Sequence, residues 1–165
     1  MYDYDRFIAL LHRPALSLYS IPAVWFTAFV PWPFKTVLIF LHSNNVWGYG
    51  NVTPRLNTSR AQKDKSLPPA IAEKILRLEG AHLNGFENLP LWFAAIILGN
   101  MAKLDNYTLN VLSLSYVCGR LLFNYLYYRQ ENDWQGSLRS IVFFVCFSMP
   151  MYILLKSAAV IAAQG

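Results

Sequence analysis

The chain has 165 residues, of which 55% are hydrophobic and only 14% are charged. This balance fits one integral membrane domain over residues 1–165 and excludes an ordinary soluble globular protein. The formal net charge is +5, but the basic residues gather in one loop between apolar segments, so we expect no nucleic-acid partner. The two cysteines, Cys118 and Cys146, lie in apolar runs, and we expect free, buried thiols there.

Long apolar runs predict an all-α membrane protein, an up-and-down bundle of four transmembrane helices. The expected spans cover residues 16–41, 69–102, 107–128 and 136–163. Pro22, Pro31 and Pro33 lie in the first span and predict a kinked or broken helix there. Lys35 lies in the same span, where it either reaches out to the headgroups or lines a pocket.

A basic loop over residues 42–68 predicts the orientation of the chain. Lysines and arginines outnumber the carboxylates in it, and loops of this kind stay on the cytosolic side of a membrane. The loop between the third and fourth spans would share that side, and both termini would face the other. We therefore expect the glycosylation sequons at Asn51 and Asn57 to remain unmodified.

The second span carries a polar stripe. At about 100° per residue, Arg77, Gly80, Asn84 and Glu87 share one helical face. Ionisable groups inside a membrane usually face the interior of a bundle or a ligand. Glu87 is therefore either a ligand-binding group or one half of an ion pair that holds helices together.

The third span has a polar face of its own. This face carries Ser113, Tyr116, Arg120, Asn124 and Tyr127. Arg120 lies deep in an apolar segment and needs a partner, and Glu87 is the carboxylate of matching depth. We expect a Glu87–Arg120 pair, within one chain or between two copies.

At the start of the fourth span, Arg139 is followed by Ser140. The arginine there either reaches the headgroups or directs its guanidinium at an anion or a thiol. The sequence contains no metal-binding, serine-hydrolase or phosphate-loop motif, so we expect no metal ion. The remaining interpretation is a cationic cleft that opens to the cytosol and takes a small anion on the wet side and a lipophilic molecule on the bilayer side.

Residues 80–90 read Gly-Ala-His-Leu-Asn-Gly-Phe-Glu-Asn-Leu-Pro. This segment resembles the second-helix signature of the MAPEG superfamily, the membrane-associated proteins in eicosanoid and glutathione metabolism, which is approximately Arg-Ala-His-x-Asn-x-x-Glu-Asn-x-Pro. Arg120 and Tyr127 resemble an Arg and Tyr pair of that family's third helix that faces the glutathione site. Arg139 resembles the arginine at the start of the fourth helix, which is often assigned to thiolate activation.

The resemblance implies a homotrimer with active sites between protomers, in the membrane of the endoplasmic reticulum. It implies glutathione bound near the cytosolic face and chemistry on a lipophilic electrophile: conjugation, peroxide reduction or isomerisation. Arg139 would activate the sulfur. The residues that would hold glutathione are Arg77, Asn84, Glu87, Arg120 and Tyr127.

The chain departs from the family pattern at three positions, and these leave a second function open. The arginine that opens the signature is Gly80, Leu83 stands where some members have a cation, and Phe123 stands where members often have His or Tyr. Arg77 lies one turn before Gly80 and would partly replace the lost cation. The alternative is a membrane subunit or scaffold of the same fold without glutathione chemistry, which partners other membrane proteins in a lipid or natural-product tailoring complex.

Overall fold

The computed structural model describes residues 2–43 and 49–164, and every regular element in these residues is a helix. The elements are α1 (Tyr2–Leu11), η1 (Leu16–Tyr19), α2 (Ser20–Phe29), α3 (Pro31–His42), η2 (Pro54–Leu56), α4 (Asn57–Lys63), α5 (Pro69–Met101), α6 (Asn106–Arg129) and α7 (Asp133–Ala162). The all-α fold class expected from the sequence is confirmed for the described residues.

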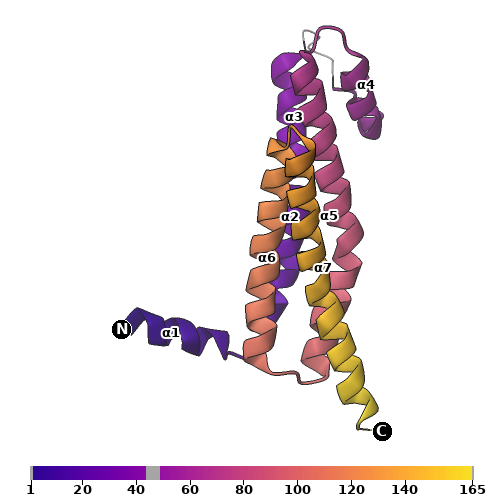
Figure 1. The fold of residues 1–165 in the computed structure, drawn as a ribbon. Helices are drawn as coiled ribbons and strands as arrows, with labels where there is room; N and C mark the ends of the chain where they lie inside the picture. Colours follow the sequence, from indigo (N-terminus) through magenta and orange to yellow (C-terminus); the bar gives the residue numbers. More distant parts are fainter. Residues whose placement is uncertain (1, 44–48, 165) are drawn as a thin grey trace.

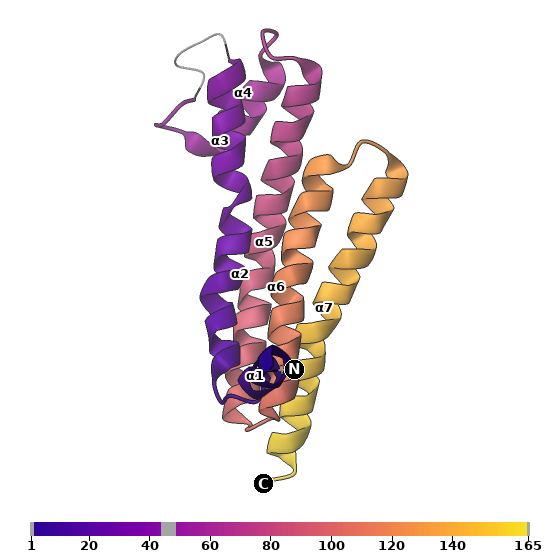
Figure 2. The ribbon, with the colours of Figure 1, turned by 90° about the vertical axis from the view of Figure 1, so that its left-hand side faces the viewer.

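The long helices run side by side around α5. Helices α2 and α3 follow each other end to end along one side of α5, and α6 and α7 lie against its other sides (Figure 1). The second view shows α7 running at an angle to α5 (Figure 2). Helix α4 lies beside one end of α5, whereas α1 projects sideways near the other end, where the chain also finishes.

Among the described residues, two helical stretches are long and apolar enough to cross a membrane, Leu16–His42 and Asp133–Ala162. Helices α5 and α6 carry the polar stripes described above, which lower their hydropathy. A four-span arrangement of the chain therefore stays a prediction.

The break expected in the first span is confirmed: α2 ends at Phe29 and α3 begins at Pro31. Pro31 has no N–H, so the carbonyl of Thr27 loses the donor that a continuous helix would supply. The side chain of Asn124 on α6 replaces that donor, with Nδ2 2.7 Å from the Thr27 oxygen. His82 Nδ1 on α5 lies 2.9 Å from the next carbonyl, that of Ala28, and donates to it in the tautomer that carries the proton on Nδ1.

Close packing of α2 against α5 depends on Gly85. A Cβ at this position would lie 2.7 Å from Cα of Ala28, so only glycine permits this approach. Further along, the ring of Trp92 on α5 stacks on Tyr116 of α6 with centroids 3.9 Å apart. Trp92 is fully buried, and its Nε1 donates to Ser20 Oγ at 3.1 Å. These contacts join α2, α5 and α6 into one core.

Lys35 does not reach out to headgroups. Its side chain is buried on α3 and forms an ion pair with Glu79 of α5. Its ammonium also donates to Thr58 Oγ1 on α4 at 3.5 Å. The charge is neutralised inside the helix packing, and the same group ties α4 to α3 and α5.

The prediction of two buried thiols is correct for one cysteine only. Both cysteines are free, and Cys146 is buried, but Cys118 is exposed. Cys118 lies on α6 away from Ser113, Tyr116 and Arg120, which face the core. An apolar neighbourhood in the sequence did not distinguish the two faces of the helix.

Candidate functional site

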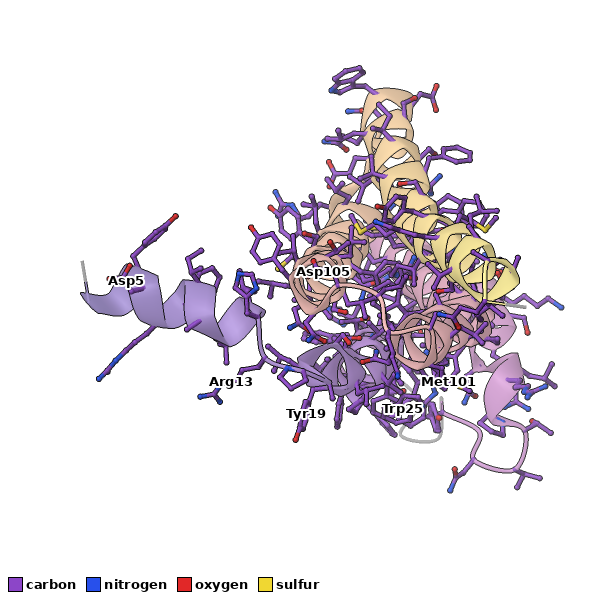
Figure 3. The ribbon with its side chains drawn as sticks, turned by 90° about the horizontal axis from the view of Figure 1, so that it is seen from below. Asp5, Arg13, Tyr19, Trp25, Met101 and Asp105 are labelled. Atoms are coloured by element: carbon purple, nitrogen blue, oxygen red, sulfur yellow. The ribbon has the colours of Figure 1, made fainter. Side chains whose placement is uncertain are left out.

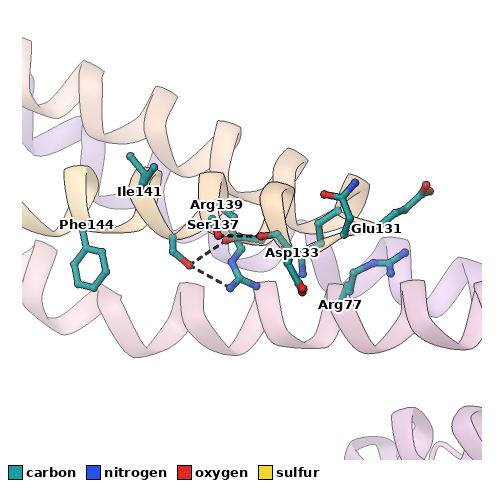
Figure 4. A pocket seen from close by; sticks show the side chains of 11 residues that line it. Arg77, Glu131, Asp133, Ser137, Arg139, Ile141 and Phe144 are labelled. Atoms are coloured by element: carbon teal, nitrogen blue, oxygen red, sulfur yellow. Dashed lines mark hydrogen bonds between the residues drawn. The ribbon is translucent and has the colours of Figure 1, made fainter.

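Helices α5, α6 and α7 enclose a crevice at the end where α6 turns into α7. It consists of two adjoining hollows, of about 740 and 230 Å³, whose walls share Arg139, Ser140 and Phe144. Arg77 and the turn residues 130–133 line the larger hollow. Arg77 from α5 and Arg139 from α7 both direct their side chains into the space between the two helices (Figure 4).

The turn before α7 holds Arg139 in place. Asn132 is the N-cap of α7, and its Oδ1 accepts from the backbone N–H of Gln135 at 3.0 Å. Gln135 Oε1 in return accepts from the N–H of Glu131 at 2.6 Å. This reciprocal pair fixes the first turn of the helix. Residues 129–135 lie between the third and fourth expected spans, but α6 extends through Arg129 and α7 begins at Asp133, so the connection is shorter than expected.

Arg139 is half-buried and lies against an aromatic ring. Its guanidinium carbon is 4.6 Å from the centre of the Tyr127 ring, within the range of a cation–π contact. Nη2 of Arg139 also donates to Ser140 Oγ at 3.4 Å. The guanidinium is therefore oriented at the junction of the two hollows, with N–H groups left for a ligand.

Arg120 has a different partner from the one expected. Its Nη2 donates to Asn84 Oδ1 at 3.0 Å, and its guanidinium carbon lies 4.6 Å from the centre of the Phe123 ring. Glu87 is exposed, and among the described residues Arg120 has no carboxylate within ion-pair distance. The Glu87–Arg120 pair within one chain is therefore wrong, because Asn84 and not Glu87 reaches α6. A pair between two copies stays a prediction.

Arg77 is only loosely paired. Its Nη1 lies 3.6 Å from Glu73 Oε2, and the Glu73 side chain is 71% exposed, so water competes for this contact. Its buried Nε has no hydrogen-bond partner among the described residues. Arg77 thus retains donor capacity at the wall of the larger hollow.

The crevice is less cationic than the sequence suggested, because Glu131 and Asp133 also line it. Phe143 and Phe144 form an apolar wall that sequence reasoning missed. The spacing of four residues between Arg139 and Phe143 was a signal that could have found Phe143, since such residues share a helical face. Glu87 does not line either hollow. Within the described residues, no group of three or more His, Cys, Asp or Glu side chains could hold a metal ion.

Long apolar helices and a charged crevice at one end of them define the class: an all-helical, membrane-associated protein with a polar site. A model of the MAPEG family matches residues 21–159, and the chain belongs to this family. Neither the curated proteins nor the solved structures gave a match.

The side chain of Tyr127 fills the space beside Gly80 on α5. A Cβ at position 80 would lie 2.8 Å from the hydroxyl of Tyr127, so a larger residue there would require Tyr127 to move.

Proposed function

We propose that this chain is a glutathione-dependent enzyme, a transferase, peroxidase or isomerase that acts on a lipophilic substrate at the membrane. Glutathione use is common among members of the family to which the chain belongs. The observation that carries the proposal is the convergence of Arg77, Asn84, Tyr127 and Arg139, from three helices, on the walls of one crevice.

The charges of the crevice suit a zwitterionic peptide. Glutathione carries two carboxylates, one ammonium group and a thiol. Arg77 and Arg139 are the groups for its anionic parts, and Glu131 and Asp133, on the same walls, are the groups for its ammonium. Arg120 engages Asn84 through Oδ1 only, so the Nδ2 group of Asn84 is a further donor for the peptide.

Arg139 is the residue that would act on the sulfur. The reactive form of a thiol is the thiolate, and a free cysteine thiol has a pKa near 8.5. A guanidinium within hydrogen-bond distance favours the thiolate and lowers that pKa. Tyr127 orients Arg139 by stacking beneath it, and Phe143 and Phe144 offer the apolar surface that a lipophilic electrophile needs.

Assembly and orientation are part of the proposal. We infer a homotrimeric four-span bundle in the endoplasmic reticulum, with the crevice and the basic loop on the cytosolic side. Exposure of Glu87 supports a site completed between copies. Glycosidase-sensitive mass on Asn51 or Asn57 in a eukaryotic host would contradict this orientation.

The test is calorimetric titration of the detergent-purified protein with glutathione. We expect saturable heat at millimolar or lower concentration. The control titrant is ophthalmic acid, the glutathione analogue with a methyl group in place of the thiol. It should bind with similar affinity, because the carboxylates and the ammonium carry most of the recognition. No heat with either peptide would overturn the enzymatic function.

A second function is favoured by the glycine at position 80. It leaves the chain without the arginine that opens the family signature, and a site that lacks a cation binds an anionic peptide less well. Tyr127 fills the space beside Gly80. The alternative is a membrane subunit that keeps the fold and partners other membrane proteins. Failure to bind glutathione, together with copurification of a second membrane protein from the native host, would establish it.

A further inference from the structure

A second pocket lies near the end of the molecule where α1 leaves the helix bundle. Its volume is about 310 Å³, and its walls come from α1, from η1 and the start of α2, and from the first half of α6. Figure 3 shows this end, with α1 projecting beyond Arg13 and Tyr19. Exposed apolar side chains stand at the mouth, among them Phe7 and Leu114. None of the residues placed at the glutathione crevice lines this pocket.

Four small polar residues interrupt the apolar wall. Ser17 and Ser20 accept hydrogen bonds from Asn100 and Trp92. The other two, Asn110 and Ser113, are three residues apart on α6 and are 3% and 5% exposed. Ser113 Oγ and Asn110 Oδ1 are buried and have no hydrogen-bond partner among the described residues. Asn110 uses its Nδ2 group on the carbonyls of Leu11 and Arg13, at 2.7 and 2.8 Å, so its orientation is fixed and only its carbonyl oxygen remains.

Such unpaired oxygens are unusual, because buried polar groups are almost always hydrogen-bonded. A serine in a helix commonly satisfies itself by donating to a carbonyl one turn back. Ser157 on α7 does so, donating to the Ile153 carbonyl at 2.7 Å. Ser113 makes no such bond, and both Ser113 and Asn110 line the pocket. The two groups are therefore a ready pair for a ligand.

We propose that this pocket binds an amphiphile made of a long hydrocarbon tail and a hydroxyl head. A hydroxyl both donates and accepts, so it can donate to Asn110 Oδ1 and accept from the hydroxyl of Ser113. A carboxylate or phosphate only accepts, and it would meet the Asn110 oxygen with repulsion. A plain hydrocarbon would leave both oxygens unpaired. The hydroxyl lies at the inner end and the tail leaves past Phe7 and Leu114.

The size of the pocket agrees with a head and the first part of a chain, because 310 Å³ is at the low end of ligand sites. Sterols and monoacylglycerols are two membrane sources of this chemistry. The assignment is independent of glutathione, because its residues lie on α1, α2 and α6 and the crevice lies where α6 turns into α7.

The test is photolabelling of the full chain in phosphatidylcholine nanodiscs, whose lipids carry no hydroxyl. The probe is hexadecanol with a diazirine in its chain, compared with the matching hexadecane probe that lacks the hydroxyl. We expect the alcohol to label residues 7–23 and 110–117 several-fold more than the alkane does. Ser113→Ala should reduce labelling by the alcohol about 2- to 10-fold, the scale of one hydrogen bond, and leave labelling by the alkane unchanged.

Ser157→Ala is the matched control, because it removes a buried but satisfied serine hydroxyl from another helix. It should leave labelling by both probes unchanged. Ala23→Phe, which places a ring at the pocket wall, should abolish labelling and does not depend on the hydrogen bonds. Equal labelling by the two probes, or no response to Ser113→Ala, would overturn the proposal. A buried water would then be the partner of Ser113 Oγ and Asn110 Oδ1.

Competition identifies the source of the hydroxyl. Displacement of the alcohol probe by unlabelled cholesterol assigns the pocket to sterols, and displacement by unlabelled monoolein assigns it to monoacylglycerols. If neither lipid displaces the alcohol probe, the assignment of the pocket to a membrane lipid is wrong.

Discussion

Arg120 and Arg139 lie on neighbouring helices, but their surroundings give them different chemistry. Arg120 is 3% exposed and is engaged by Asn84 and by the face of Phe123. Arg139 is half-buried at the wall of both hollows, with one contact to Tyr127 and one to Ser140. A guanidinium that acts on a bound substrate must be accessible from the pocket, as Arg139 is. Arg139 is therefore the better candidate for chemistry, whereas Arg120 positions Asn84.

The first prediction follows from this difference. Arg139→Ala should lower turnover with a general electrophile about 10-fold or more, the scale of one charged hydrogen bond lost from a transition state. Binding of glutathione should change less, since thiolate stabilisation acts on the chemical step. Spectrophotometric titration should show the pKa of the bound thiol rising towards about 8.5 in the variant.

Lys156→Ala is the control for this change, because Lys156 also lies on α7 but lines neither hollow, and its ammonium donates to the hydroxyl of Tyr152 at 3.0 Å. It should leave turnover and the thiol pKa unchanged. Equal losses in the two variants would show that Arg139 acts through the stability of α7 and not on sulfur.

At the scale of the elements, the ion pair between Lys35 and Glu79 holds α3, α4 and α5 together. Breaking a buried pair leaves one charge uncompensated, so Glu79→Gln should lower the free energy of unfolding by about 3–5 kcal/mol. The double change Lys35→Met with Glu79→Leu should cost much less, because no charge remains. Thermal unfolding in detergent measures both.

Glu73→Gln is the matched control on the same helix. Its carboxylate pairs with Arg77 at 3.6 Å but is 71% exposed, so its removal should change stability by no more than about 0.5 kcal/mol. If Glu79→Gln lowers the free energy of unfolding no more than Glu73→Gln does, the Lys35–Glu79 ion pair makes no net contribution to stability.

The start of α6 carries a pH-dependent contribution. Asp105 is its N-cap, and hydrogen bonds from the backbone N–H and the hydroxyl of Thr108 lower the pKa of the Asp105 carboxyl below its usual 3.8. A carboxyl whose folded pKa is lowered stabilises the fold fully above its unfolded pKa and loses that effect as the pH falls through the folded value. Thermal melting should therefore show wild-type stability falling below about pH 4 more steeply than that of Asp105→Ala.

Asp64 supplies a comparison, because hydrogen bonds from the side chain and backbone of Ser66 lower the pKa of its carboxyl in the same direction. It lies in the connection before α5 and caps no helix of the core. Asp64→Ala should therefore alter the acid limb less than Asp105→Ala does. The opposite order would show that the N-terminus of α6 is not where acid unfolding begins.

The sequence predicted the helices and their breaks better than it predicted the side-chain contacts between helices. Proline chemistry is local, so Pro31 predicted the break between α2 and α3. The donors that stabilise the break, Asn124 and His82, lie on other helices, and no local pattern identifies them. The charge of Lys35 was visible in the sequence, but its pairing with Glu79 depends on how α3 and α5 face each other.

The candidate site shows the same division. Helical periodicity grouped Asn84 with Glu87, and α6 lies against the side of that stripe which carries Asn84. Asn84, the observed partner of Arg120, and Glu87, the expected one, are therefore less than one helical turn apart. Arg139 and Tyr127 were both selected from the sequence, but their contact depends on the glycine at position 80, whose space the tyrosine occupies.

At the scale of the whole molecule, the remaining question is what Glu87 faces. It is exposed on α5, three residues after Asn84, the residue that binds Arg120 of α6. A carboxylate on a helix that lies in a membrane needs a cation or a polar partner, and in the proposed trimer a second copy of the chain would be that partner. A trimer that places Glu87 of one copy against α6 of the next would also add a carboxylate beside Arg120, which has none within ion-pair distance among the described residues of its own chain.

The last prediction tests that arrangement by exchanging charges. Glu87→Arg alone should convert a trimer into monomers, because it places two cations together in a low-dielectric interface. Arg120→Glu alone should do the same, and the double exchange should restore at least part of the trimer, since opposite charges again meet. Native mass spectrometry of the detergent-solubilised protein reports the assembly directly. Lys103→Glu, a charge reversal at the exposed turn between α5 and α6, should leave the mass unchanged. A trimer that survives Glu87→Arg intact would place Glu87 outside the interface and end the case for a pair between copies.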